Sequence, residues 1–135
     1  MGATALRATV LAAWPAYREA SNRSNAQVLA PLAPADILYV SILPGLAEEL
    51  LFRGALLPAV APDWRGAAVA GLVFGALHSG GGRNAAFAAF ASLLGCLYGG
   101  LLLATGSLWV PAIAHSAANV TSAALWTAQQ KGELR

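Results

Sequence analysis

The sequence contains few charged residues, and those present do not cluster. Asp, Glu, Lys and Arg make up 10% of its 135 residues, against roughly a quarter in an ordinary soluble domain. Between Asn84 and Gln130 there are none. The eight basic residues are scattered and form no patch that would follow a phosphate backbone. An ordinary soluble domain and a nucleic-acid partner are both excluded on these grounds.

Other absent residues and motifs limit the kinds of catalysis that the chain could perform. The single cysteine, Cys96, excludes an intrachain disulfide, and its place in the apolar run Ala85–Ala104 favours a packing role. No Gly-x-Ser-x-Gly pattern, typical of a serine nucleophile, is present. The His-Glu-x-x-His pattern of many zinc proteases is also missing. Nucleophilic catalysis is therefore disfavoured.

Apolar residues are present in excess. They account for 58% of the chain, and the mean hydropathy is +0.61. The charge-free stretch from 84 to 130 is long enough for two membrane helices of about 20 residues each. We predict an all-α, multi-pass transmembrane bundle of about four membrane helices plus a short N-terminal helical element. It would be integral to the cell membrane, with membrane lipid around it.

The predicted membrane helices follow one another through short connections. They cover about Ala35–Val60, Arg65–His78, Asn84–Ala104 and Leu108–Ala128. Pro44-Gly45 should kink or split the first of them. This core, residues 35–128, is preceded by a helical and linker segment over 1–34, in which the polar stretch Tyr17–Pro34 should be an extramembrane connection. A polar tail is predicted over 129–135.

Small residues predict how the helices pack. Gly71-x-x-x-Gly75 and Gly95-x-x-x-Gly99 lie on consecutive predicted helices. Small residues at this spacing let helix backbones approach closely, which matters because lipid supplies no hydrophobic drive for helix association. A packing role is a sufficient explanation for these four glycines.

One charged motif lies where a membrane helix should tolerate no charge. Glu48-Glu49-Leu-Leu-Phe-Arg53 sits in the middle of an apolar run, and ionisable groups at such depth are candidates for function. Glu49 and Arg53 have the four-residue spacing of an ion pair on one helix face. Glu48 lies about 100° around the helix, so it is free to face the bundle interior. A purely structural charge network is the alternative interpretation.

Both histidines of the chain belong to apolar helices and have a four-residue partner. Phe74-Gly-Ala-Leu-His78 places a ring and an imidazole on one face, and His115-Ser-Ala-Ala-Asn119 places an imidazole beside a carboxamide. A lone histidine in such a helix is usually a satisfied core residue. The presence of Glu48 on another helix makes a shared polar centre the more specific hypothesis.

These groups are the ones that amide hydrolysis inside a membrane requires. The reaction needs a water, a base that deprotonates it, and donors for the developing oxyanion. Glu48 and His78 would hold and activate the water. His115 and Asn119 would supply the donors.

The three motifs Glu-Glu-x-x-x-Arg, Phe-x-x-x-His and His-x-x-x-Asn together resemble the CPBP family of intramembrane proteases. That family includes type II CAAX prenyl endopeptidases and proteins related to abortive infection and bacteriocin immunity. The flanks Glu48–Gly54 and Thr105–Asn119 are also similar, and the likeness covers about Ala35–Ala128.

The resemblance implies an all-helical membrane protease that cleaves peptide or protein substrates, prenylated CAAX sequences among them. Glu48 would then be the activating glutamate and Glu49 with Arg53 its supporting pair, while Phe74 would shape the substrate pocket. His78 would position the water, and His115 with Asn119 would bind the oxyanion. Family members carry further helices before the first motif, so the resemblance also predicts that this chain is a fragment or a minimal version.

The sequence leaves two questions open: whether the protein uses a metal cofactor, and whether it is an active enzyme. The family often carries a metalloprotease label, and Glu48, Glu49, His78 and His115 would be the zinc ligands in that case. We expect a metal-independent glutamate mechanism with no cofactor. An inactive membrane scaffold or immunity protein of the same fold is the second hypothesis, and an ion or proton carrier is the third.

Overall fold

The part of the chain that the structure describes is almost entirely helical. The computed structural model describes residues 2–133, and no strand occurs among them. The elements in order are α1 (Gly2–Ala13), α2 (Pro15–Leu29), α3 (Pro34–Glu49), the π-helical segment η1 (Leu50–Leu56), α4 (Leu57–Val60), α5 (Trp64–Leu77), α6 (Ala85–Thr105) and α7 (Trp109–Glu133). The all-α prediction is confirmed.

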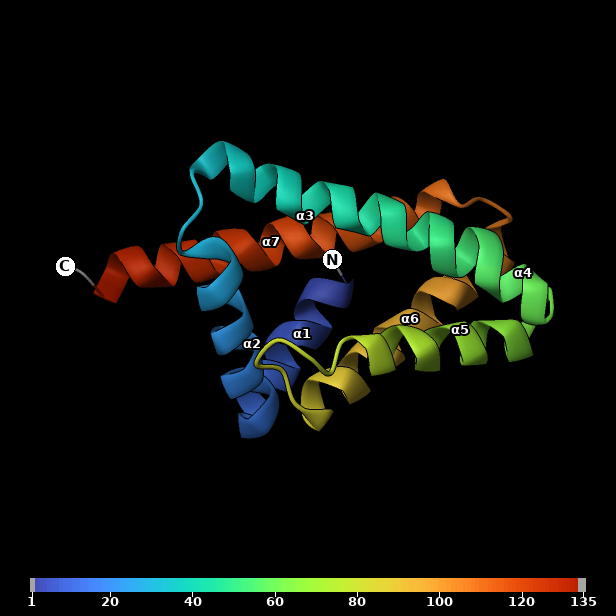
Figure 1. The fold of residues 1–135 in the computed structure, drawn as a ribbon, viewed down its shortest axis with the longest axis horizontal. Helices are drawn as coiled ribbons and strands as arrows, with labels where there is room; N and C mark the ends of the chain where they lie inside the picture. Colours follow the sequence, from blue (N-terminus) through green and yellow to red (C-terminus); the bar gives the residue numbers. More distant parts are fainter. Residues whose placement is uncertain (1, 134–135) are drawn as a thin grey trace.

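Two helix pairs form the framework (Figure 1). α3 packs along α7 in one layer, and α5 packs along α6 in the other. η1 and α4 continue α3 towards α5, where the two layers approach each other. At the opposite end α2 bridges the layers and contacts both α6 and α7. This arrangement brings the inner faces of α3, α5 and α7 towards one another.

Local capping chemistry sets the helix boundaries. The Asp63 carboxylate accepts a hydrogen bond from the Arg65 backbone N–H at 2.8 Å and so caps α5. Hydrogen bonds from the Arg65 side chain and backbone hold the pKa of Asp63 below its ordinary value. Asn84 caps α6 by accepting from Phe87 N–H at 3.0 Å. Gly106 ends α6 with a left-handed φ of 67°, which glycine adopts without strain.

The irregularity in the first predicted membrane helix lies after the carboxylates rather than before them. α3 is not split at Pro44-Gly45 but runs on to Glu49. Close packing fixes α3 there, because a Cβ on Gly45 would lie 3.0 Å from the Ser116 backbone nitrogen of α7. The π-helical bonding of η1 precedes Pro58, which has no N–H to donate to the carbonyl four residues back.

The polar stretch Tyr17–Pro34 is mostly helix, and its place outside the membrane stays a prediction. Pro15 occupies the first turn of α2, where its missing N–H costs nothing. Residues 17, 20, 21 and 24 share one buried face. Within that face the Tyr17 ring packs on Phe90 of α6 with centroids 4.5 Å apart. Burial of this stripe explains why a polar segment is helical.

The bounds predicted for the four membrane helices lie within two residues of those in the structure, except at the C-terminal end of the last helix. α7 continues past Ala128 to Glu133, so residues 129–133 of the predicted tail are helical. Residues 134 and 135 lie outside the described part. The division into segments 1–34, 35–128 and 129–135 stays a prediction.

The glycine patterns on α5 and α6 do bring the two backbones together. A Cβ on Gly71 would lie 2.6 Å from the Cys96 backbone nitrogen, and one on Gly95 would lie 2.8 Å from the Gly71 Cα. Glycine is the only residue that fits such an approach without moving a backbone. Cys96 lies in this contact, as expected of a packing residue.

Large apolar side chains face outward over much of the described surface. Among the exposed ones are Leu38, Leu43, Leu50, Leu51, Leu72, Leu77, Leu93, Leu97, Ile113 and Leu125. By length and composition, α6 alone qualifies as a membrane span within residues 2–133, and α2 with the α3–α4 helix would qualify together but is bent by 119°. α5, at 14 residues, is apolar but short. The expected number of about four spans stays a prediction.

Candidate functional site

Glu49 and Arg53 form a buried ion pair, as their spacing suggested. Their side chains are 0% exposed, and Arg53 Nη1 donates to Glu49 Oε1 at 2.9 Å. Arg53 Nη2 donates to the Gly95 carbonyl of α6 at 2.7 Å. The guanidinium also lies against the rings of Phe74 and Tyr98, 5.0 and 5.5 Å from their centroids. The pair therefore joins α3 and η1 to α6.

His115 on α7 is held by the same carboxylate. Its Nδ1 lies 2.8 Å from Glu49 Oε1. A carboxylate paired with arginine is ionised and can only accept, so His115 Nδ1 carries the proton and donates it. The imidazole stacks on Tyr98 with centroids 5.0 Å apart. Its Nε2 faces Glu48 Oε2 at 3.7 Å.

His78, at the C-terminal end of α5, is oriented by its own helix. Nδ1 lies 2.7 Å from the Phe74 carbonyl oxygen, which can only accept, so Nδ1 is protonated. The imidazole packs on the Phe74 ring with centroids 4.3 Å apart. Its Nε2 faces Glu48 Oε1 at 3.9 Å. The two histidines thus present the same nitrogen, unprotonated in the neutral ring, to one carboxylate.

Glu48 lies apart from the buried pair and opens to a cavity. Its side chain is 30% exposed, in contrast to the fully buried Glu49 next to it. Each of its carboxylate oxygens faces a different imidazole at 3.7–3.9 Å. Those separations exceed a direct hydrogen bond and suit a bridging water.

Asn119 lies one turn after His115 on α7. Its Nδ2 donates to the Ser41 carbonyl of α3 at 3.2 Å. This bond uses one of the two amide hydrogens and fixes the carboxamide, while the second hydrogen has no acceptor in the described residues. Phe74 is buried and meets Phe52 edge to face at 5.1 Å, so it forms part of the wall behind the two imidazoles.

A cavity of about 600 Å³ joins these groups. Its lining includes every predicted site residue except Glu49 and Arg53, which lie behind it: Glu48, Phe74, His78, His115 and Asn119. The rest of the lining comes from α1, α2 and α6, from further residues of α3 and α7, and from Arg83 in the turn before α6. The convergence of groups from three separate helices is therefore a property of the fold.

Two contributors were missed by sequence reasoning. Tyr98 stacks on His115 and contacts the Arg53 guanidinium, and the Gly95 carbonyl accepts from Arg53. Tyr98 is the one tyrosine in the charge-free stretch from 84 to 130, which is the only signal that might have identified it. Gly95 carried no signal beyond its small size.

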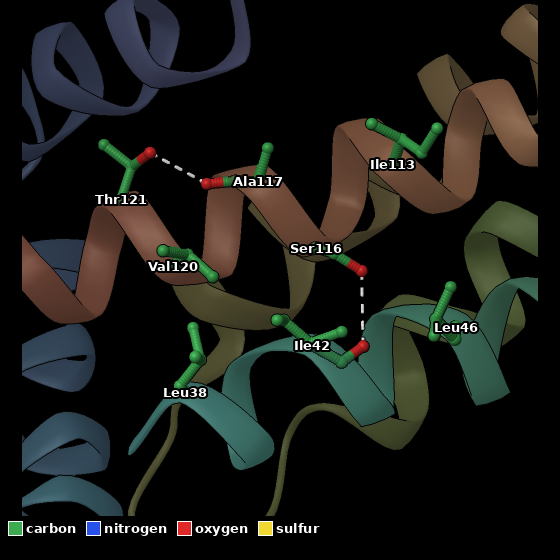
Figure 2. Close-up of a pocket in the computed structure, with 8 residues that line it drawn as sticks. All are labelled: Leu38, Ile42, Leu46, Ile113, Ser116, Ala117, Val120 and Thr121. Carbon is green, nitrogen blue, oxygen red and sulfur yellow. Dashed lines mark hydrogen bonds between the residues drawn. The ribbon is translucent and has the colours of Figure 1, made fainter. Parts of the chain in front are cut away.

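A second hollow, of about 460 Å³, lies between the outer faces of α3 and α7 (Figure 2). Its two hydroxyl groups are turned onto backbone carbonyls, Ser116 onto Ile42 at 3.2 Å and Thr121 onto Ala117 at 2.8 Å. The rest of the lining is apolar. It holds no group capable of proton transfer, so the chemistry belongs to the larger cavity.

A zinc ion in this cavity would need Glu48, Glu49, His78 and His115 as its donor set. Imidazole nitrogens and carboxylates are suitable zinc donors. Among the side chains that the structure describes, however, no three of His, Cys, Asp or Glu are arranged to hold a metal ion. Glu49 in particular is committed to Arg53 and His115.

Comparison with known families agrees with the geometry. Residues 30–121 match the family model described as type II CAAX prenyl endopeptidase Rce1-like. The matched range includes all seven predicted site residues: Glu48, Glu49, Arg53, Phe74, His78, His115 and Asn119. No curated protein and no solved structure matches the chain.

Proposed function

Since the chain belongs to the type II CAAX prenyl endopeptidase Rce1-like family, we propose that it is a multi-pass membrane endopeptidase. Members of this family are integral membrane proteins, and the family implies a membrane-associated peptide as substrate. The substrate class that the family description names is the prenylated CAAX sequence. Apolar side chains on the outer surface and ion pairs inside suit a protein that works in lipid.

One observation carries the proposal: Glu48 stands between the Nε2 atoms of His78 and His115. Both imidazoles hold their proton on Nδ1, so each neutral ring turns a lone pair towards the same small volume. A water there would donate its two hydrogens to two of these three acceptors. Its oxygen lone pair would then be directed away from them, towards the cavity.

The reaction follows from this geometry. Glu48 accepts a proton from the water as its oxygen attacks the carbonyl carbon of the peptide bond. The protonated Glu48 then donates that proton to the amide nitrogen as the C–N bond breaks. The products are a carboxylic acid and an amine, and one water is consumed. His78 acts as a positioning residue for the water.

The developing oxyanion needs donors on the other side of the carbonyl. The second amide hydrogen of Asn119 is available for this in every protonation state. His115 can donate from Nε2 only as an imidazolium, because its Nδ1–H is engaged with Glu49. The Glu49 carboxylate, 2.8 Å from Nδ1, holds the ring in this orientation. Glu49 and Arg53 thus support the reaction without contacting the substrate.

The experiment is hydrolysis of a prenylated CAAX peptide by the purified chain in lipid vesicles. Mass spectrometry should find two products whose masses sum to the peptide plus one water. The double variant His78→Ala, His115→Ala should lose this activity while its helical circular dichroism is retained. Because the proposed mechanism uses no metal, the wild-type activity should persist after exhaustive chelation.

The competing hypothesis is an inactive scaffold or immunity protein of the same fold. Absence of cleavage by the wild-type chain, with a folded spectrum, would favour it over the protease. Equal cleavage by the wild type and the double-histidine variant would remove the mechanism proposed above.

A further inference from the structure

Arg83 differs from the other described cations in its surroundings. It is partly buried and lines the cavity that contains Glu48 and His78. Three other arginines have a carboxylate partner, in the pairs Arg23–Glu19, Arg53–Glu49 and Arg65–Asp63. Among the residues whose side chains the structure describes, a set that does not include Arg7 or Glu133, Arg83 has no such partner and is the only Arg or Lys on the cavity wall.

The contacts of Arg83 orient it but leave its outer face free. Nε donates to the Ser24 hydroxyl at 3.0 Å, and the guanidinium lies 5.0 Å from the Phe87 ring centroid. Both partners are uncharged. No hydrogen bond from Nη1 or Nη2 to another described residue is present, so those two nitrogens can donate to a ligand.

The turn that carries Arg83 is fixed against α2. Arg23 Nε donates to the Gly82 carbonyl at 3.1 Å, and Asn84 Nδ2 donates to the Ala16 carbonyl at 2.9 Å. Gly81 and Gly82 have positive φ values of 66° and 80°, which let the chain turn tightly between His78 and Arg83. A guanidinium held in place in this way loses little freedom when it binds.

An arginine that presents a free fork of donors in a cavity suits a planar carboxylate. Every peptide has a carboxylate at its C-terminus, whatever its sequence. A cavity of about 600 Å³ lies within the usual range of roughly 300–1,000 Å³ for small-ligand sites. It therefore suits a short peptide end rather than a folded domain.

We propose that Arg83 binds the free C-terminal carboxylate of the substrate and thereby directs hydrolysis to a bond a few residues from the chain end. This inference rests on the proposed protease function. Arg83 would be a specificity-determining residue, not a participant in bond breaking. A lipid phosphate offers similar anionic oxygens, so the test must separate the two sources.

The test uses two prenylated peptides of identical sequence, one ending in a carboxylate and one in a carboxamide. The 135-residue chain in zwitterionic vesicles should cleave the acid at least about tenfold more efficiently in kcat/KM, chiefly through KM. Arg83→Gln should remove this preference, and Arg83→Lys should retain part of it. Arg18→Gln, an exposed cation on α2, is the matched control and should keep the preference.

Equal cleavage of the two peptides by the wild type would overturn the inference, and this arm depends on no variant. Retention of the full preference by Arg83→Gln would overturn it as well. If neither peptide is cleaved, the proposed function fails, but binding of both peptides to the wild type still tests Arg83 by fluorescence anisotropy. Loss of the acid preference on adding anionic phospholipid would assign the site to a lipid phosphate instead.

Discussion

At the scale of single residues, two neighbouring glutamates occupy opposite environments. Glu49 is fully buried and shares one carboxylate oxygen between Arg53 and His115. Glu48 is partly exposed and faces two imidazole nitrogens across a cavity. The 100° between consecutive helical residues is enough to separate a structural role from a chemical one.

The buried pair leads to a prediction about stability. Glu49→Gln should lower the free energy of unfolding by about 3–5 kcal/mol, because it leaves the Arg53 charge buried without a partner. The matched control is Glu19→Gln, which breaks a pair with the same four-residue spacing on the surface of α2. Its cost should be about 0–1 kcal/mol. Chemical unfolding in detergent micelles measures both, and equal losses would contradict the structural role of Glu49.

Spacing along the sequence was sufficient to predict the Glu49–Arg53 pair and the separate position of Glu48, because both follow from helix geometry. It could not predict the Gly95 carbonyl as a partner of Arg53, since those residues are 42 positions apart. Nor could it predict Tyr98 against His115. Such contacts depend on how two helices are aligned with each other, and the sequence of either helix alone does not specify that alignment.

At the scale of elements, the α5–α6 contact positions the site. Arg53 reaches the Gly95 carbonyl, and Gly95 lies against Gly71 in the close contact between the two helices. The glycine patterns predicted this close approach. By contrast, the helical state of α2 was not expected, because its polar composition concealed a buried stripe that only packing against α6 makes favourable. Similarly, close packing on α7 offset the tendency of Pro44 to break α3.

The glycine contact gives a second stability prediction. Gly71→Ala should destabilise the fold by about 1–3 kcal/mol, because the added methyl group meets the Cys96 backbone, which cannot move aside cheaply. Gly100→Ala on α6 is the control, since nothing lies within 4 Å of its Cβ. It should stabilise the helix by about 0.5–1 kcal/mol. Thermal unfolding in detergent measures both, and a neutral Gly71→Ala would show that the helices are further apart.

At the scale of the whole molecule, the layers α3–α7 and α5–α6 enclose polar groups within an apolar exterior. The sequence predicted the helices and the groups that should meet, and the fold brings those groups together around one cavity. The sequence did not predict that α1 and α2 would line the same cavity. That wall includes the polar contacts that fix the turn between His78 and Arg83.

The most direct test of the central claim is the turnover of a prenylated peptide by Glu48→Gln under saturating substrate, with Glu19→Gln as control. Loss of the base should lower kcat by about 10²–10⁴-fold, while the unfolding midpoint stays that of the wild type because Glu48 holds no structural pair. Glu19→Gln should retain full activity. Wild-type kcat in the Glu48→Gln variant would contradict the assignment of Glu48 as the base that activates water.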